Sequence, residues 1–477
     1  MTRTGDRSAI PISTPAQAGW AALAALVVLV LVTVAGLVVA GTTSRPTAVR
    51  HRTETTATPT ERQLVCPSSD TDTTSYVGLL PRTPDGGRVR AEGRTLVLAA
   101  GTVATVGPPG RDSLTVTARG AATRGVFATR VKKAGGMTRC GSPRSSWWFV
   151  GAGASPRHFS TLELVNPRSG PAVVDVTVWG PDGLVEGAGL RGISVRSGRK
   201  KSLNLADAAP SDGNLALHVE VSRGLVMADV EDHAVDVLDP TAAPVAEWIP
   251  DQGGPATHLV LSGLPHPPAQ GTAATPDPAL PASLRDGASL VLANPSDSAV
   301  VARVRLSGKE GAFSPKGLQP TTVPPQSVVS VPLGDVIDAP GTAVLVDADG
   351  PVAAGYVVPS AGDLLHAVNA TRWRGPAAAA LPKLGKKTVL LTATSGAGKV
   401  TVTELGPLGV QLAETLVEVP VRSTVGTKLR SDTASVVVRS DGHVVGSVLV
   451  NRSETFAALP LTPVLAALRV PQVRLAG

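Results

Sequence analysis

Two short segments of this 477-residue chain nearly repeat each other, and the repeat limits the chain to a small set of folds. Leu162–Pro167 reads LELVNP, and Leu290–Pro295 reads LVLANP. A turn and a valine-rich alternating stretch follow each copy, at Val173–Val178 and Val300–Leu306. Alternation with a period of two indicates a β-strand that is buried on one face. The repeat therefore predicts β-modules in series, and Thr388–Ala393 looks like a third, degenerate copy.

Composition favours the same fold class. Valine, alanine, glycine, proline and threonine dominate, whereas aromatic residues make up 3% of the chain. β-Branched residues favour pleated sheets, glycine and proline mark turns, and helical periodicity is almost absent. Units of roughly 80–110 residues with many short strands are typical of β-sandwiches. We therefore expect an all-β protein made of tandem immunoglobulin-like β-sandwich modules.

A second element recurs after each copy of the first. Leu217–Ala228, Val344–Tyr356 and Val436–Ser447 each contain two apolar stretches separated by a glycine. Asp-Gly pairs, which also occur elsewhere in the chain as at Asp182-Gly183, favour the tight turns of β-hairpins. We expect each element to be a hairpin whose second strand carries small residues, so that a neighbouring sheet can approach closely.

These features set the expected domain boundaries. We predict an N-terminal β-module with a disulfide at residues 64–150 and β-sandwich repeats at residues 151–255, 287–372 and 384–477. Residues 256–286 are rich in proline, glycine and alanine, which predicts a linker or a long loop. Three segments precede the modules: a cytoplasmic tail at 1–18, a transmembrane helix or signal segment at 19–41, and a Thr/Pro-rich spacer at 42–63.

The apolar run Trp20–Gly41 contains no charge and no proline. About 20 apolar helical residues match a hydrocarbon core of about 30 Å. This length favours a retained membrane helix over a cleaved signal peptide, although Val38–Ala40 would serve as a cleavage site. Arginines near both ends make the positive-inside count ambiguous. Because a long chain follows a short tail, we expect a single-pass cell-membrane protein with its ectodomain outside, or a secreted protein after cleavage.

Cys66 and Cys140 are the two cysteines of the chain. An even count in an exported chain predicts one disulfide, and two free thiols are the alternative. No Cys/His spacing indicates zinc, and we expect no cofactor.

Trp147 and Trp148 belong to the one aromatic cluster of the sequence. Exposed tryptophans could stack on sugar rings. Alternatively, one ring is buried in a core while the other covers a sheet edge or a domain junction, since large rings contribute most to small cores. Burial is the interpretation that we favour.

Basic residues gather in three clusters within a chain of formal net charge +7. The clusters are Arg130–Lys133, Arg196 with Arg199, Lys200 and Lys201, and Lys383 with Lys386 and Lys387. They are either solvated loops and strand ends or sites for anionic lipids and acidic wall polymers. Nucleic acid is disfavoured, because no aromatic residues interleave with the clusters and the chain is expected to be exported.

Asp229, Glu231 and His233 form a weak metal-site candidate, since alternation could place them on one face of a strand. A solvated strand end is the favoured alternative. The sequence contains neither HExxH nor GxSxG, so no catalytic residues are predicted.

The order of these features resembles a known group of proteins. Leu64–Pro67 is followed by Cys140, by Trp147–Gly151, by Leu162–Pro167 and by Val173–Gly180. This pattern is similar to that of uncharacterised, mostly actinobacterial secreted proteins that are defined only by a domain of unknown function. The resemblance implies an envelope location and a β-rich ectodomain, and it implies no catalytic residues.

The sequence predicts a non-enzymatic, membrane-anchored, extracytoplasmic β-repeat protein of the bacterial cell envelope, with a structural or protein-interaction role. The membrane and cell-wall polymers or envelope proteins are the expected partners. One alternative is a cell-wall polysaccharide-binding module that uses Trp147, Trp148, Lys200 or Lys201. A second alternative is a hydrolase whose site is assembled from distant residues.

Overall fold

The structure is a computed structural model, and it describes residues 54–57, 59–133, 135–235, 244–264, 280–285, 287–334, 336–337, 341–360, 363–452, 455–464 and 468–471. Among these residues, no helix is both long and apolar enough to cross a membrane. The predicted tail at 1–18 and the predicted membrane helix at 19–41 lie outside the described residues.

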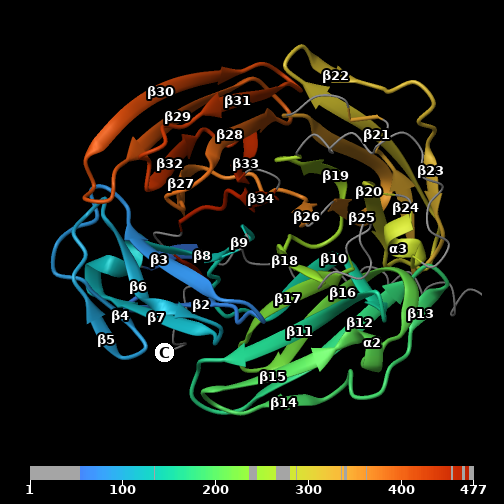
Figure 1. Cartoon of the computed structure of the whole chain (residues 1–477), viewed down its shortest axis with the longest axis horizontal. Helices are drawn as coiled ribbons and strands as arrows, with labels where there is room; N and C mark the ends of the chain where they lie inside the picture. The colour runs from blue at the N-terminus through green and yellow to red at the C-terminus, as the bar shows by residue number, and fades with distance from the viewer. Residues whose placement is uncertain are drawn as a thin grey trace, which may run out of the picture. The chain divides into compact units, whose positions relative to one another are not determined.

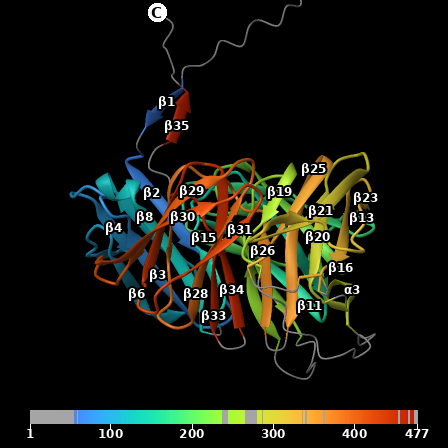
Figure 2. The same ribbon diagram turned by 90° about the horizontal axis from the view of Figure 1, so that it is seen from above.

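The chain divides into two compact units. The described part of one unit is strand β1 (Glu54–Ala57) paired with β35 (Leu468–Pro471), as Figure 2 shows. Residues 58–468 form the other unit, and everything that follows concerns this unit alone.

The larger unit consists of β-strands with short helical turns, which confirms the predicted all-β fold class (Figure 1). The short helices within the described residues are η1 (Gly120–Arg124), α2 (Leu205–Ala208) and α3 (Ala282–Arg285). The strands group into four β-sandwiches.

The first sandwich contains β2 (Glu61–Cys66), β3 (Thr73–Leu79), β4 (Arg88–Ala91), β5 (Arg94–Leu96), β6 (Val103–Gly110), β7 (Leu114–Arg119), β8 (Val126–Lys132) and β9 (Met137–Arg139). The second contains β10 (Ser146–Ser155), β11 (His158–Asn166), β12 (Ala172–Gly180), β13 (Gly183–Val185), β14 (Ile193–Val195), β15 (Arg199–Asn204), β16 (Ser211–Arg223), β17 (Met227–Ala234) and β18 (Val245–Ile249).

The third sandwich contains β19 (Ala256–Leu261), β20 (Ser289–Asn294), β21 (Val300–Gly308), β22 (Gly311–Phe313), β23 (Thr321–Val323), β24 (Ser327–Pro332), β25 (Ala343–Ser360) and β26 (Asp363–Val368). The fourth contains β27 (Gly375–Ala380), β28 (Lys386–Ala393), β29 (Gly398–Leu405), β30 (Gln411–Val419), β31 (Thr424–Lys428), β32 (Ser435–Ser440), β33 (Val444–Arg452) and β34 (Thr455–Pro460).

All four sandwiches use the same strand pairing. In the first, one sheet has the order β2-β7-β4-β5 and the other has the order β6-β3-β8-β9. We call these sheet A and sheet B. The fourth sandwich repeats the scheme as β27-β32-β29-β30 and β31-β28-β33-β34. The second and third follow it with one extra short strand each, β14 on β12 and β23 on β21.

The inner strands of each sandwich pair as in the immunoglobulin fold, whereas the outer strands do not. In the fourth sandwich the second strand pairs with the fifth (β28 with β31) and the third with the sixth (β29 with β32). These pairings correspond to B with E and C with F of the immunoglobulin fold. The first strand, however, pairs with the sixth, and the seventh pairs with the second. The immunoglobulin-like assignment therefore stays a prediction.

The predicted hairpins at Leu217–Ala228, Val344–Tyr356 and Val436–Ser447 are wrong. In each case the two strands belong to opposite sheets: β16 pairs with β10 and β12, whereas β17 pairs with β11 and β18. β25 crosses from sheet A to sheet B as one 18-residue strand. A glycine between two apolar stretches therefore does not show whether the two stretches pair with each other. Asp182-Gly183 does join a paired hairpin, β12 with β13.

The module boundaries also differ from the predicted ones. β10 begins at Ser146, before the expected boundary at 150–151, and β19 (Ala256–Leu261) lies in the stretch predicted as a linker at 256–286. β27 precedes the predicted start at 384 and reads GPAAAA. Such a composition is typical of a loop, yet its backbone completes the ladder with β32. The sequence signal of β27 is thus weaker than that of the valine-rich strand β32 with which it pairs.

The repeated Asn-Pro motif has one structural role in both copies. Asn166 ends β11, and its Nδ2 donates to the carbonyl oxygens of Gly170 and Val195, both at 2.9 Å. Asn294 ends β20 and donates in the same way to Ser298 at 2.8 Å and to Val323 at 3.1 Å. Each buried asparagine therefore ties the turn after the second strand to a later strand of its sandwich.

Sheet A of each sandwich packs against sheet B of the next. Trp148 on β10 joins Val357 on β25 and Leu364 on β26 in one apolar cluster between the second and third sandwiches. Ser307 on β21 and Thr424 on β31 lie 3.0 Å apart, oxygen to oxygen, between the third and fourth.

The same kind of contact connects the last sandwich to the first. Leu405 and Val437 of the fourth sandwich pack with Leu80 and Phe127 of the first. The eighth strands contact one another in the same cyclic order, β9 with β18, β18 with β26, β26 with β34, and β34 with β9 (Figure 1). The four sandwiches thus form a closed cycle of contacts.

Candidate anion-binding pocket

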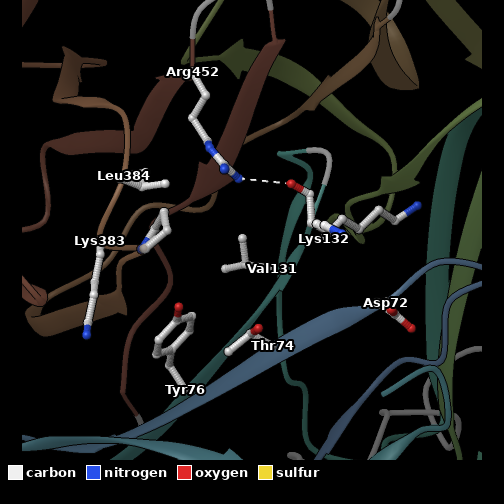
Figure 3. A pocket seen from close by; sticks show the side chains of 10 residues that line it. Asp72, Thr74, Tyr76, Val131, Lys132, Lys383, Leu384 and Arg452 are labelled. Atoms are coloured by element: carbon white, nitrogen blue, oxygen red, sulfur yellow. Dashed lines mark hydrogen bonds between the residues drawn. The ribbon is translucent and has the colours of Figure 1, made fainter. Parts of the chain in front are cut away.

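A pocket of about 580 Å³ lies between the first and fourth sandwiches (Figure 3). Strands β3 and β8 supply one wall, and the segment before β28 together with the end of β33 supplies the other. The residues that line it are Asp72, Thr74, Tyr76, Val131, Lys132, Lys133, Pro382, Lys383, Leu384 and Arg452.

The lining is strongly basic. It contains four cationic side chains and one carboxylate, that of Asp72. Oδ1 of this carboxylate lies 3.4 Å from Nε of Arg111. Lys132 and Lys133 come from the first basic cluster of the sequence, and Lys383 comes from the third. The fold therefore brings two clusters together that lie about 250 residues apart, and it adds Arg452, which no sequence pattern had indicated.

The centre of the pocket combines a guanidinium group with a phenol. Arg452 and Tyr76 point toward each other across Val131, whereas Lys383 extends outward (Figure 3). Nη1 of Arg452 donates to the carbonyl oxygen of Lys133 at 3.2 Å. Burial raises the pKa of Tyr76, although the nearby Arg452 acts in the opposite direction. The tyrosine is thus a neutral hydroxyl donor at physiological pH, beside a fixed cation.

Lys132 serves a different purpose. Its side chain is 1% exposed, and its ammonium lies 2.7 Å from Oε1 of Glu231 and 4.5 Å from the ring centroid of Trp248. It therefore joins the first sandwich to the second. Lys133, Lys383 and the half-buried Arg452 are left as the cations that face solvent. Cations and hydroxyl groups around an open hollow are suited to bind an anionic group.

The predicted disulfide is confirmed. Cys66 and Cys140 are bonded, and the bond links the end of β2 to the segment after β9 across 74 residues. Closing a loop of this length stabilises the fold by about 4 kcal/mol in the chain-entropy model.

Trp147 and Trp148 are both buried, at 1% and 8% exposure. Trp147 points into the core of the second sandwich, and its Nε1 donates to the carbonyl oxygen of Val226 at 3.2 Å. Trp148 lies at the junction with the third sandwich, where it stacks on Trp179 with centroids 5.3 Å apart. This is the favoured arrangement of one core ring and one junction ring. Neither ring offers an open face for a sugar in this structure.

Lys200 and Lys201 are exposed on edge strand β15 and point to opposite faces of it. Nζ of Lys200 is 2.9 Å from Oε2 of Glu163 on the neighbouring strand. Lys200 also lines a hollow between the first and second sandwiches, whereas Lys201 does not.

The predicted metal candidates Asp229, Glu231 and His233 share one face of β17, as their spacing indicates. The potential ligand atoms that come within 4.8 Å of one another, however, belong to Asp70, Glu231 and His233. Glu231 is already engaged, since it pairs with Lys132 and accepts from the hydroxyl of Ser69 at 2.7 Å. These neighbours disfavour a metal at Glu231.

Asp229 stands apart from that group. Burial raises its pKa well above the usual value, and the charges of Glu163 and Glu231 act in the same direction. Its Oδ2 has no hydrogen-bond partner among the described residues. An environment that favours the protonated carboxyl disfavours cation binding, which argues against the predicted role of Asp229.

A second cluster of ionisable residues is absent from the sequence predictions. Asp232 accepts from Nε2 of His158 at 2.8 Å and from Nε2 of His366 at 2.9 Å, and all three side chains are fully buried between the second and third sandwiches. Burial alone would raise the pKa of Asp232, but the two histidines lower it well below its usual value. His158 also contacts the hydroxyl of Ser283, 2.7 Å from Nδ1.

The chain was compared with known proteins. The model of a family of unknown function (DUF5719) matches residues 109–430, from β6 of the first sandwich to the loop after β31 of the fourth. No curated protein shows significant similarity to the chain.

Proposed function

Because the chain belongs to this family of unknown function, its role has to follow from its own residues, and we propose that it is a non-enzymatic binding protein of the bacterial cell envelope. It acts as a rigid scaffold of four sandwiches, held at the membrane by the apolar run Trp20–Gly41 with its ectodomain outside. Its pocket between the first and fourth sandwiches binds anionic groups of an envelope polymer. The immunoglobulin-like classification of the sandwiches is part of this proposal.

The basic pocket carries the proposal. It combines Lys133, Lys383 and Arg452 with the hydroxyl of Tyr76 around one hollow of about 580 Å³. Leu384 is 65% exposed beside these polar groups, which gives the apolar part of a ligand a surface to contact. A disulfide between Cys66 and Cys140 is typical of proteins outside the cytoplasm, and it supports an extracytoplasmic location.

A sedimentation experiment with purified cell wall tests this function. We expect the ectodomain to sediment with wall that carries anionic polymers, and to remain in the supernatant at high salt, since exposed charges are screened. The double variant Lys383→Gln/Arg452→Gln is expected to weaken binding about tenfold, because a hydrogen bond to a charged group contributes about 1.5–3 kcal/mol.

The control is Lys399→Gln/Lys428→Gln, which removes the same charge from strands of the fourth sandwich away from the pocket. Wild-type binding by this control would assign the effect to the pocket. Equal binding by the pocket variant and the wild type would refute the proposed site. Failure of the wild type to sediment with any wall would refute the function.

One observation favours a second candidate function, a hydrolase. Ser283, His158 and Asp232 follow the nucleophile–base–acid order of serine hydrolases, with contacts of 2.7 Å and 2.8 Å. All three side chains are buried, however, and Asp232 also binds His366. We expect a fluorophosphonate probe to leave the folded protein unlabelled. Labelling that disappears in Ser283→Ala would favour the hydrolase.

A further inference from the structure

Two neighbouring hollows, of about 270 and 370 Å³, meet on the side of the first sandwich that faces the second. Glu92 and Thr115 line both hollows, so the two adjoin, and we treat them together as one groove. The groove runs from β4 and β7 of the first sandwich to β15 of the second. We call it the A-face groove. Its lining residues are Arg88, Arg90, Glu92, Gly93, Ser113, Thr115, Thr117, Arg119, Val165, Asn166, Pro167, Gly198, Arg199 and Lys200.

The groove has cations on both sides. Arg88, Arg90 and Arg119 come from the first sandwich, and Arg199 and Lys200 come from the second. One acid, Glu92, lies among them. With five cations and one acid, the lining has an excess of four positive charges.

Two of the cations form ion pairs with acids that do not line the groove. Arg119 lies 2.7 Å from Glu61, and Lys200 lies 2.9 Å from Glu163. Their side chains are still 64% and 42% exposed, respectively. Each ion pair orients one head group and still leaves donors for a ligand.

Arg90 is also pre-positioned. Its Nε donates to the carbonyl oxygen of Gly93 at 3.0 Å, across the tight turn between β4 and β5. Glu92 and Gly93 in this turn have φ values of 47° and 78°, which gives the turn a fixed shape. Arg88 lies two positions earlier on the same strand face, about 7 Å away along the strand. The strand thus presents two cations at a regular interval.

The floor of the groove is made of hydroxyl groups. β7 alternates, with Leu114 and Val116 buried in the core and Thr115 and Thr117 on the opposite face. Neither threonine hydroxyl has a hydrogen-bond partner among the described residues. They are free to contact the oxygen atoms of a ligand.

We propose that the A-face groove binds a linear polymer that carries anionic groups along its length. The proposal rests on the envelope-binding function above, but it concerns a separate site, since no residue is shared with the pocket around Arg452. An extended ligand fits because the cations follow one another across two sandwiches rather than converging on one point. The groove has no aromatic side chain, so it lacks the stacking platforms that single-stranded nucleic acids use.

Direct binding measurements with defined polymers test the groove. The probes are polyglycerol phosphate, polygalacturonate, neutral dextran and a single-stranded oligonucleotide, each titrated into the intact ectodomain at two salt concentrations. We expect one or both acidic polymers to bind, more tightly as chain length grows, and dextran not to bind. The two acidic probes separate phosphodiester from carboxylate recognition.

The groove variant is Arg88→Gln/Arg90→Gln/Arg199→Gln. Its control, Arg303→Gln/Lys309→Gln/Lys316→Gln, removes three exposed charges from the third sandwich. We expect the groove variant to lose at least tenfold in polymer affinity and to show a smaller salt dependence, because fewer counterions are exchanged. The control is expected to bind like the wild type. Thermal melting verifies that both variants are folded.

Several outcomes would overturn the proposal. They are equal affinity of the groove variant and the wild type, equal losses in the variant and its control, binding of dextran, and tighter binding of the oligonucleotide than of either polymer. The pocket variant Lys383→Gln/Arg452→Gln distinguishes the two sites. If it loses wall binding while the groove variant keeps full polymer affinity, the pocket function stands and the groove proposal fails.

Discussion

Asp232 and Asp229 are two buried carboxylates on one strand with opposite environments. Asp232 accepts from two histidines and from the hydroxyl of Ser160, so it is stabilised as an anion. Asp229 has a raised pKa and an unpartnered oxygen. The alternation of β17 separates them, since successive side chains of a strand point to opposite faces.

These environments predict opposite responses to the same substitution. Asp232→Asn should lower the free energy of unfolding by about 3–5 kcal/mol, because it leaves buried donors without their anion. Asp229→Asn should leave the free energy unchanged or raise it, since asparagine resembles the protonated acid. Urea denaturation with an unchanged m-value measures both. A loss in Asp229→Asn as large as that in Asp232→Asn would contradict this account.

Single residues also show which contacts could be predicted from the sequence and which could not. The disulfide followed from the cysteine count, and the contrasting places of Trp147 and Trp148 followed from the large contribution that aromatic rings make to small cores. The partners of Asp232 could not be predicted, because His158 and His366 lie 74 and 134 positions away and no local pattern connects them. The pocket residues Tyr76 and Arg452 are unpredictable for the same reason.

At the scale of the strand, small residues mark places where two sandwiches meet. Gly355 on β25 faces Val150 of the second sandwich, and a Cβ atom on this glycine would lie 2.5 Å from the Val150 carbonyl oxygen. Small residues were expected here from the sequence, although the expected hairpin was wrong. Small residues in the sequence predict where two sheets approach each other closely. They do not predict which strands pair.

Gly355→Ala should therefore destabilise the protein by about 1–3 kcal/mol, the usual effect of overpacking. Gly308→Ala on β21 is the matched control, since no atom lies within 4 Å of its added Cβ. Chemical denaturation of both variants gives the comparison. Equal stability of the two would show that the sheets at Gly355 are free to move apart.

At the scale of the molecule, two acids on the eighth strands of the second and third sandwiches predict how the stability of the protein depends on pH. Burial raises the pKa of Glu247 on β18 to about 8, against the attraction of Lys132, and raises the pKa of Asp363 on β26 to about 7. A carboxyl with a higher pKa in the folded state binds its proton more tightly there. The folded state therefore loses stability as pH rises from about 4, the unfolded value, to about 8.

We expect the melting temperature to fall between pH 5 and pH 8, and Glu247→Gln to reduce this fall. Glu418→Gln, at an exposed position on β30, should leave the profile unchanged. Scanning calorimetry across this pH range is the measurement. A Glu247→Gln profile as steep as that of the wild type would rule out this carboxyl as the source.

The contact between the fourth sandwich and the first also has a consequence for self-assembly, because it prevents the chain from forming filaments. Sheet A of one sandwich receives sheet B of another, so the contact is heterologous, and such contacts grow into filaments unless they close. Here sheet A of the fourth sandwich contacts sheet B of the first within one molecule. Neither face is therefore free to bind a second copy of the chain. A chain ending before β27 should expose sheet A of the third sandwich and sheet B of the first sandwich. We expect it to form oligomers that lengthen with concentration in light scattering, whereas the full ectodomain keeps a constant mass.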